Sequence, residues 1–251
     1  MIPKKLKPNG LYDLTRIGKN NDGGYLICKN NYDESDCLIS FGISNDFSFE
    51  KAFKNKTEKK ILAFDPTTTN NFFLKDIIFN FLRFKFTSFF LSIINFYNFK
   101  KFFSSKNSLF FLKKIGKGGS IKEEYISIDH ILDLCKDRKK IFFKIDIEGS
   151  EYRILKDLLK NEELISGLVI EFHDVDLHLD KIINFIDQSK LKLIHVHGNN
   201  WLDYGQNNIP TCLELTFSKN PTLISEQVDF PHILDQKNNP NVEDIILNFE
   251  K

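Results

Sequence analysis

Short apolar runs recur along the chain and alternate with amphipathic stretches. Each run is four to seven residues long and is rich in Ile, Leu, Phe and Val. Near-continuous apolar runs of this length are typical of strands that are buried on both faces of a parallel sheet. The pattern therefore predicts seven strands, over residues 37–41, 61–64, 108–112, 141–145, 168–172, 191–196 and 211–217.

Three stretches between these runs predict helices, because their apolar residues recur three or four positions apart, over 128–135, 152–159 and 179–186. Alternating strands and helices build right-handed βαβ units. Only a polar loop, 198–210, separates the last two runs, which favours an antiparallel pair at one edge. We predict an α/β fold: a doubly wound, Rossmann-like, seven-stranded, mostly parallel sheet with an antiparallel edge strand, in a single domain over 1–251.

Three segments lie outside this minimal pattern. Residues 1–35 form an N-terminal extension, in which Asp22-Gly-Gly-Tyr25 predicts either a lid over a ligand or a hairpin turn. Residues 219–251 form a polar C-terminal extension. Residues 70–106 are too long for an ordinary connection between two strands and are dense in phenylalanine.

The chain contains 26 Phe, which AT-rich codon usage accounts for in most positions. In the Phe-rich segment the longest stretch without charge, 86–99, is shorter than the ~20 apolar residues of a membrane-spanning helix. No transmembrane span is expected. The segment predicts helices packed on the catalytic domain, as a cover over the substrate or a homodimer surface, and a membrane surface is the alternative.

The balance of charges restricts the partners. With 35 Lys+Arg against 34 Asp+Glu, the net charge of +1 lacks the basic footprint of a nucleic-acid-binding protein. The four cysteines, Cys28, Cys37, Cys135 and Cys212, form no C-x-x-C pair, and a disulfide framework is not expected in a chain of this length. The N-terminus has no apolar region of a signal peptide, so we expect a cytoplasmic protein.

Ligands of an open α/β sheet bind beyond the carboxyl ends of its strands. Gly42 follows the first predicted strand, but the other glycines of G-x-G-x-x-G are missing, which argues against a dinucleotide on this turn. Asp65 ends the second strand, where a carboxylate can accept hydrogen bonds from two ribose hydroxyls or simply cap a turn.

The segment 144–155, KIDIEGSEYRIL, has the pattern K-x-D-x-E-G-x-E-x-x-x-L. With the segments 22–25 (DGGY), 40–50 (SFGISNDFSFE), 64–67 (FDPT) and 170–173 (IEFH), it resembles the FkbM-type S-adenosylmethionine-dependent methyltransferases. The resemblance covers roughly residues 16–217. It departs at the first turn, where many members have an Asp-x-Gly-Ala-Asn type sequence.

The resemblance implies S-adenosylmethionine as the cofactor and a hydroxyl of a sugar or glycan precursor as the methyl acceptor, in the making of a surface polysaccharide. The precursor can be phosphorylated or nucleotide-linked. The adenine would lie near 118–122 and the ribose at Asp65. The residues implied in cofactor binding are Gly42, Ser44, Asn45, Glu50, Asp65 and Asp146.

Methyl transfer to a hydroxyl requires a base for the proton of the acceptor. Asp146, Glu148 and Glu151 lie so close in sequence that a cation must separate their charges, and Lys144, Arg153 or a metal could supply it. Strand parity places Glu171 and His173 on one face, and His195 and His197 on one face of the next run. The catalytic candidates are Asp146, Glu148, His173 and His197.

Mixed oxygen and nitrogen ligands suit a divalent Mg, Mn or Zn ion. The candidate ligands are Asp146, Glu171, His173 and His197, with the two histidines expected beside the Asp146 strand end. The alternative is a hydrogen-bonded polar cluster in which His173 or His197 is the general base.

The segment Asn199-Asn200-Trp201 predicts either a cradle for a polar, sugar-like small molecule or an ordinary turn. Two other functions compete with methyl transfer. One is an NAD-dependent oxidoreductase, which the missing glycines oppose. The other is a non-catalytic methyltransferase-like module that binds a partner or a membrane surface, which the set Asp65, Asp146, Glu148 and His173 opposes.

Overall fold

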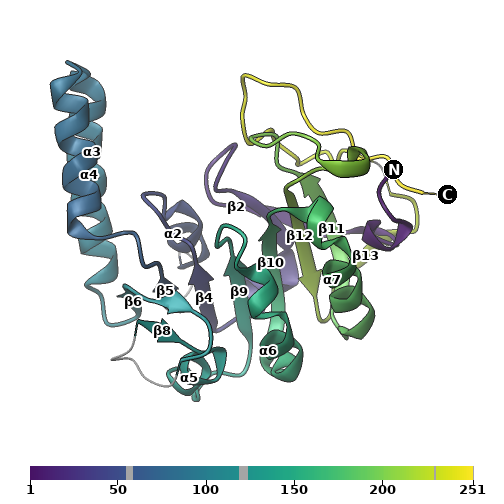
Figure 1. The fold of residues 1–251 in the computed structure, drawn as a ribbon. Helices are drawn as coiled ribbons and strands as arrows, with labels where there is room; N and C mark the ends of the chain where they lie inside the picture. The colour runs from purple at the N-terminus through teal and green to yellow at the C-terminus, as the bar shows by residue number, and fades with distance from the viewer. Residues whose placement is uncertain (55–58, 119–123, 229, 251) are drawn as a thin grey trace.

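The computed structural model describes residues 1–54, 59–118, 124–228 and 230–250. Every predicted apolar run is a strand of one seven-stranded sheet, in the order β11-β12-β10-β9-β4-β5-β6 (Figure 1). The strands are β4 (Cys37–Phe41), β5 (Lys60–Phe64), β6 (Ser108–Phe111), β9 (Ile141–Ile145), β10 (Ile165–Phe172), β11 (Lys192–Gly198) and β12 (Leu213–Ser218).

The predicted antiparallel pair, β11 and β12, lies at one edge of the sheet. The antiparallel strand itself is second from the edge, because β12 is inserted between β10 and β11 and runs antiparallel to both. The crossover from β10 to β11 through α7 (Val175–Gln188) leaves a gap of one strand, which β12 fills. This insertion separates the histidines of β11 from β10.

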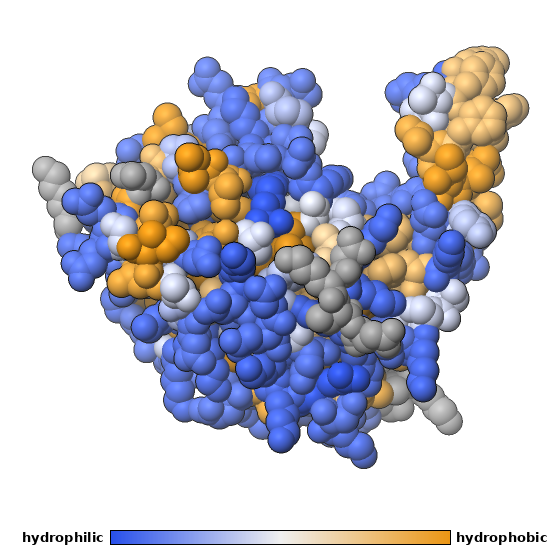
Figure 2. Space-filling model, turned by 180° about the vertical axis from the view of Figure 1, so that it is seen from behind, coloured by the Kyte–Doolittle hydropathy of each residue, from blue (hydrophilic) through white to orange (hydrophobic). Residues whose placement is uncertain are grey.

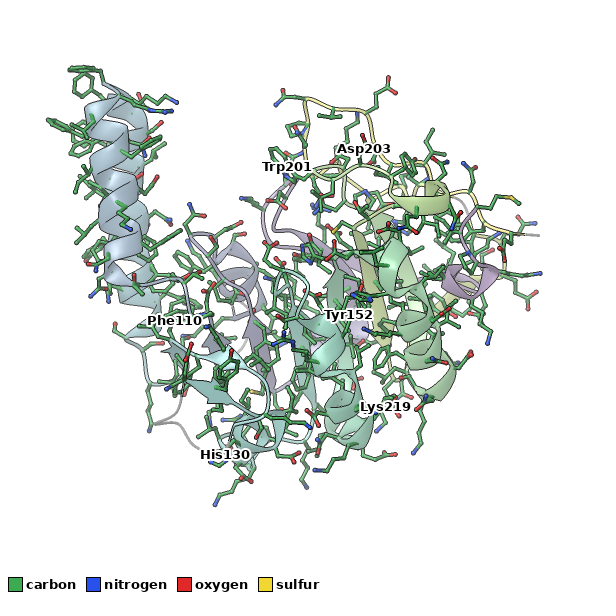
Figure 3. The ribbon with its side chains drawn as sticks, in the orientation of Figure 1. Phe110, His130, Tyr152, Trp201, Asp203 and Lys219 are labelled. Atoms are coloured by element: carbon green, nitrogen blue, oxygen red, sulfur yellow. The ribbon has the colours of Figure 1, made fainter. Side chains whose placement is uncertain are left out.

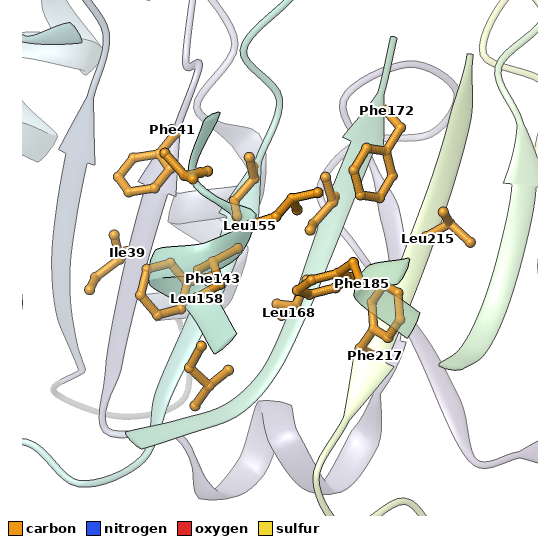
Figure 4. Close-up of a cluster of buried hydrophobic side chains, with 14 of the residues drawn as sticks. Ile39, Phe41, Phe143, Leu155, Leu158, Leu168, Phe172, Phe185, Leu215 and Phe217 are labelled. Atoms are coloured by element: carbon orange, nitrogen blue, oxygen red, sulfur yellow. The ribbon is translucent and has the colours of Figure 1, made fainter. Parts of the chain in front are cut away.

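Helices cover one face of the sheet. They are α5 (Ile128–Asp133), α6 (Leu155–Lys160) and α7, which confirms the three predicted helices, although the second begins with a separate 3-10 turn, η2 (Glu151–Arg153). Their apolar stripes pack on the strands in one continuous core (Figure 4). The labelled side chains of that core are buried: Ile39, Phe41, Phe143, Leu155, Leu158, Leu168, Phe172, Phe185, Leu215 and Phe217.

A helix and a β-hairpin cover the opposite face. Alternate residues of the same strands, such as Leu38 and Phe142, point to this side and contact α2 (Ser48–Lys54). The hairpin consists of β2 (Leu14–Ile17) and β3 (Tyr25–Cys28), which pair antiparallel, so Asp22-Gly-Gly lies in the connection of a hairpin. It is followed by α1 (Lys29–Glu34).

Both ends of the chain meet beside the sheet (Figure 1). β1 (Leu11–Tyr12) pairs with β13 (Leu223–Ser225), and Ile2 forms a bridge with Phe249. The remaining short elements are the pair β7 (Lys114–Ile115) and β8 (Tyr125–Ile126) and the 3-10 turns η1 (Lys4–Leu6), η3 (Glu162–Leu164) and η4 (Gln206–Asn208).

The Phe-rich segment forms a helical hairpin of α3 (Asn70–Leu82) and α4 (Phe86–Phe103) that projects from the β6 edge of the sheet (Figures 1 and 2). Only its base packs on the domain, where Phe73 and Phe99 are buried with Ile43 and Phe47. The helices predicted over this segment are present, and they contact the domain through this base. Among the described helices, none has the length and apolar character needed to cross a membrane.

The turn after β4 depends on glycine at position 42. Gly42 has a φ of +74°, and a Cβ there would lie 1.6 Å from the carbonyl oxygen of Asp146. The chain can pass this close to β9 only without a side chain. By contrast, Gly149 has a φ of +89°, but the nearest atom to its Cβ would be 3.6 Å away.

Gly42→Ala is therefore expected to lower the free energy of unfolding by about 4 kcal/mol or more, since backbone must move against backbone. Gly149→Ala is the matched control, because Gly149 has the left-handed conformation without the clash. This substitution is expected to lower the free energy of unfolding by about 1–2 kcal/mol. Denaturant unfolding of both variants measures the difference. Equal losses would contradict the role assigned to the close approach.

Candidate functional site

A cavity of about 560 Å³ opens at the carboxyl ends of the central strands. The turn after β4, the ends of β9 and β10, the β2–β3 connection and the loop after β11 line it. Trp201, which is 57% exposed, lies at the rim on that last loop, across from the helical hairpin (Figure 3). The position agrees with the site expected for an open α/β sheet.

A second cavity, of about 320 Å³, adjoins the first. Gly42, Asp65 and Asp146 line both, so the two form neighbouring lobes around one turn. The second lobe has apolar and aromatic walls from Ile115 and Tyr125, on either side of the segment expected to hold an adenine. Of that expected segment, 119–122 lies outside the described residues.

Asp65 ties the turn after β4 to the turn after β5. One carboxylate oxygen accepts hydrogen bonds from the backbone N–H groups of Ile43 and Ser44, at 2.9 and 2.8 Å. The other accepts from the N–H and hydroxyl of Thr67, both at 2.6 Å, and from the N–H of Thr68. Burial alone raises the pKa of Asp65, but these hydrogen bonds outweigh it and lower the pKa below its ordinary value.

A carboxylate has about four lone-pair positions, and five donors already surround Asp65. Its role in this structure is to hold the turn that contains Ser44. Hydrogen bonds to a ribose would have to replace some of these donors. The two predicted roles of Asp65, holding a turn and binding a ribose, therefore compete for the same two carboxylate oxygens.

Glu50 presents a buried acceptor beside the cavity. One of its oxygens accepts a hydrogen bond from the Ser40 hydroxyl at 2.5 Å, and the other, Oε2, is buried with no hydrogen-bond partner among the described residues. Burial raises the pKa of Glu50, and the nearby Lys144 partly offsets the effect. An unpaired buried acceptor at a cavity wall fits a ligand that carries an ammonium group.

A buried network joins β3, β9 and β10 at the floor of the cavity. The Tyr25 hydroxyl donates to Glu171 at 2.8 Å and lies 3.3 Å from Asp146. Lys144 lies 3.5 Å from the Asp146 carboxylate and donates to the carbonyl oxygen of Gly42. Burial, followed by the charges of Asp146 and Glu214, raises the pKa of Glu171 to about 8.

His173 stands where this network meets the cavity. Its Nδ1 lies 3.2 Å from Glu151, and its Nε2 lies 3.4 Å from Glu148 and 3.7 Å from Glu171. Burial by itself lowers the pKa of His173, but the hydrogen bond to Glu151 and the charges of Glu171 and Asp146 outweigh it and raise the pKa to about 9. The imidazole is therefore a cation at neutral pH.

Two groups of ligand-type atoms surround His173, each within 4.8 Å. One combines His173 with Asp146 and Glu148, and the other with Glu171 and Cys212. Asp146 and Glu171 each lie near His173 but in separate groups, so the predicted single set of Asp146, Glu171 and His173 is not one of the groups found among the described residues. The side chain of Glu148 is 85% exposed on a backbone with φ +51°, which places its carboxylate at the open side of the site.

The structure does not place His197 in this site. Because β12 separates β11 from β10, Glu214 stands between Glu171 and His197. His197 lies 3.5 Å from Glu214 and 3.5 Å from Asp244 of the C-terminal extension. Burial by itself lowers the pKa of His197, but the hydrogen bonds that its ring donates to Asp244 and Glu214 outweigh the burial and raise the pKa to about 10. The expected adjacency to the Asp146 strand end is wrong.

The C-terminal extension covers this part of the edge through several polar contacts. Asp235 accepts a hydrogen bond from His195 at 2.8 Å, and Asn238 donates to Glu214 at 2.6 Å. Asn200 is tied to the same extension through the carbonyl of Asn239. The histidines of β11 thus hold the extension in place.

Two site residues have no counterpart in the sequence analysis, Tyr25 and Cys212. Tyr25 ends the Asp-Gly-Gly-Tyr segment, which entered the sequence analysis as a turn or lid and as part of the family resemblance but without a role for this side chain. Its hydroxyl contacts the acids of β9 and β10. Cys212 lies 3.3 Å from Glu171 and was assessed only as a reduced cysteine. All four cysteines are free and buried, as predicted.

The sheet order and the two-lobed cavity at the carboxyl ends define an α/β methyltransferase-like protein. The family model described as "Methyltransferase FkbM domain" matches residues 18–193, well over half of the chain. The chain belongs to this methyltransferase family, and its methyl donor is S-adenosylmethionine. Gly42, the unpaired Glu50 oxygen and the adjoining apolar lobe are compatible with that cofactor.

Solved structures with a similar arrangement have low sequence identity. An rRNA methylase from Streptococcus thermophilus is 12% identical with a TM-score of 0.38, covering 76% of this chain and 96% of its own. TrmK of M. capricolum in complex with S-adenosyl-homocysteine is 12% identical with a TM-score of 0.35. The match covers 77% of this chain and 67% of that chain. The fibrillarin/Nop5p complex is 9% identical with a TM-score of 0.38, and the match covers 74% of this chain and 73% of that chain. No curated protein matches the chain.

The electrostatics of His173 can be measured by NMR titration of its imidazole. Glu151→Gln preserves an oxygen that can accept from Gly149 but removes the charge beside Nδ1, so the pKa of His173 is expected to fall from about 9. Glu163→Gln, on the far surface, is the control and should leave the value unchanged. An unchanged pKa in Glu151→Gln would refute the assigned cause.

Proposed function

We propose that this enzyme transfers a methyl group from S-adenosylmethionine to a hydroxyl of an uncharged, sugar-like small molecule in the cytoplasm, for the making of a surface polysaccharide. The observation that carries the proposal is the position of His173, whose Nε2 faces carboxylates at the cavity that the turn after β4 also lines. A hydroxyl acceptor needs a base to take its proton, and His173 would supply it in its neutral form.

The charges of the cavity favour a cationic cofactor and an uncharged acceptor. Seven acidic residues line the larger lobe against three cationic groups, Lys19, Lys144 and the imidazolium of His173, and even with Glu171 protonated the acids remain in excess. S-adenosylmethionine supplies an electrophilic methyl group on a positively charged sulfur. The surplus of carboxylates disfavours a phosphorylated or nucleotide-linked acceptor, because like charges repel in a partly desolvated site. It also disfavours nucleic acid.

The acceptor would enter past the loop after β11. Trp201 offers an exposed ring at the rim, and Asn199 donates a hydrogen bond to Glu171 at 2.8 Å, which ties this loop to the acidic floor. A flat aromatic ring beside polar side chains is a common arrangement for binding a sugar. Loop and floor would then hold the acceptor oxygen beside His173.

The proton would move to Nε2 of His173, while the hydrogen bond between Nδ1 and Glu151 fixes the orientation of the ring. At neutral pH the surrounding carboxylates hold Nε2 protonated. The free base increases as the pH rises through about 9. Asp146 and Glu148 stabilise the imidazolium after proton transfer, since each carries a carboxylate in the same group of atoms.

A metal-assisted route is the second candidate, because Asp146, Glu148 and His173 offer three ligand-type atoms within 4.8 Å. Such a mixed set suits Mg²⁺ or Mn²⁺. Activity that a chelator abolishes and Mn²⁺ restores would favour this route. His197 has no part in it, since its partners are Glu214 and Asp244.

Cofactor binding can be tested without knowing the acceptor. S-adenosylhomocysteine at about 100 times its Kd is expected to stabilise the protein by ~2.7 kcal/mol in thermal unfolding, whereas NAD should have no effect. Glu50→Gln should raise the Kd of S-adenosylhomocysteine about tenfold and so reduce the stabilisation, because the unpaired buried oxygen loses its charge. Stabilisation by NAD alone would refute the assignment.

Acceptor chemistry can be tested by the release of S-adenosylhomocysteine with a panel of uncharged and phosphorylated sugars. The rate with the best acceptor is expected to rise with pH through about 9, as His173 loses its proton. His173→Gln should lower kcat by about 10²–10⁴-fold and remove this pH dependence, with cofactor binding retained. A pH profile that survives in His173→Gln would exclude this histidine as the base.

A further inference from the structure

The helical hairpin of α3 and α4 exposes its apolar side chains on the outside. In α3 the exposed residues recur at helical spacing, and so do those in α4. They are Leu74, Ile78, Phe79, Phe81 and Leu82 in α3 and Phe86, Phe90, Leu91, Ile93, Ile94 and Tyr97 in α4, where Phe79 and Leu91 flank the two stripes. Each helix thus presents a row of large apolar side chains to solvent, whereas exposed apolar residues of a monomer are usually scattered singly.

Polar side chains lie between the two helices instead. Ser92 of α4 donates to Asp76 of α3 at 2.5 Å, and Asn80 of α3 donates to Ser92 at 3.0 Å. Asn80 also contacts Asp76 at 3.2 Å along α3. Hydrogen bonds of this kind join helices in membranes, where the surrounding phase cannot satisfy a polar group.

The apolar stripes face away from this polar seam on both helices. Ile78 is two positions from Asp76 and from Asn80, which is about 200° around the helix from either. Phe90 and Ile94 have the same relation to Ser92. The two stripes therefore lie on opposite outer sides of the hairpin. A second copy of the chain would cover one side, whereas a lipid phase covers both.

The tip combines aromatic and basic side chains. Phe84 is 78% exposed and has a left-handed φ of +57°, a conformation that glycine or asparagine adopts at lower cost. Arg83 and Lys85 flank it, and they are the only charged residues between positions 76 and 100. A strained, exposed aromatic residue at a turn indicates a function for its side chain.

The hairpin also differs in charge from the rest of the protein. Residues 70–103 contain five basic residues and one acid, a net charge of +4, whereas the whole chain has +1. Basic side chains next to an apolar surface favour a bilayer with anionic headgroups. The helix α3, with 13 residues, is about 20 Å long, less than the ~30 Å of a bilayer core, so the hairpin can enter one leaflet without crossing.

We propose that the α3–α4 hairpin docks this protein on an anionic lipid bilayer by inserting its outward apolar faces and its Phe84 tip into the interface. Arg83 and Lys85 extend to the headgroups on flexible side chains. The hairpin and the C-terminal extension both rise at the carboxyl edge of the sheet (Figure 1), so docking brings the candidate site close to the lipid surface.

The test is flotation of the full-length protein with vesicles, because bound protein rises in a density gradient and aggregates do not. The protein is expected to float with vesicles of equal parts phosphatidylglycerol and phosphatidylcholine. The combined variant Leu82→Ser, Phe84→Ser and Phe86→Ser should lower the partition coefficient at least about tenfold. Arg83→Ala and Lys85→Ala should each lower it about fivefold.

The matched control is Leu177→Ser with Ile233→Ser, two exposed apolar residues elsewhere, which should float like the parent protein. All substituted side chains are exposed, so the unfolding temperature should change little, and binding of S-adenosylhomocysteine reports separately on the domain. No flotation, or equal flotation of the tip variant, would overturn the proposal. So would a dimer that the tip variant dissociates in a protein that does not float.

Discussion

The buried ammonium group of Lys144 is the interaction on which the candidate site depends. Burial by itself lowers the pKa of Lys144, but the charges of Asp146, Glu50 and Glu171 outweigh it and raise the pKa. Without this cation, the carboxylates of Glu50 on α2, Asp146 after β9 and Glu171 in β10 would repel one another in a poorly hydrated region. Lys144 also donates to the carbonyl of Gly42, so the same group connects the charges of β9 to the turn after β4.

The position of β12 determines which polar residues share the site. Had β11 followed β10 directly, His197 would stand beside Glu171. With β12 between them, Glu214 takes that place, and His197 pairs with Glu214 and Asp244. Two histidines of the same type at equivalent strand ends therefore have different roles: His173 faces the cavity, and His197 binds the C-terminal extension.

The local pattern of the sequence was sufficient for the strands and for much of the site. Apolar runs end at the observed strand ends, so Asp65, Asp146 and His173 could be placed at the carboxyl edge before the fold was known. The order of the strands was not fully predictable, because pairing of β12 with β10 depends on contacts between distant segments. Tyr25 was missed for the same reason, as its hydroxyl acts 146 residues away in the sequence, on Glu171.

The phenylalanines show why composition alone could not distinguish these parts of the molecule. Phe142 and Phe143 are fully buried because they alternate between the two covered faces of β9. Phe81 and Phe90 have the same chemistry but lie on α3 and α4, whose facing positions Asp76, Asn80 and Ser92 occupy. Periodicity decides the outcome: where polar residues take the seam between two helices, the apolar residues must face outward. The polar seam, the ring contact between Phe81 and Phe89 and the packed base hold the hairpin together, while its outer apolar side chains stay exposed.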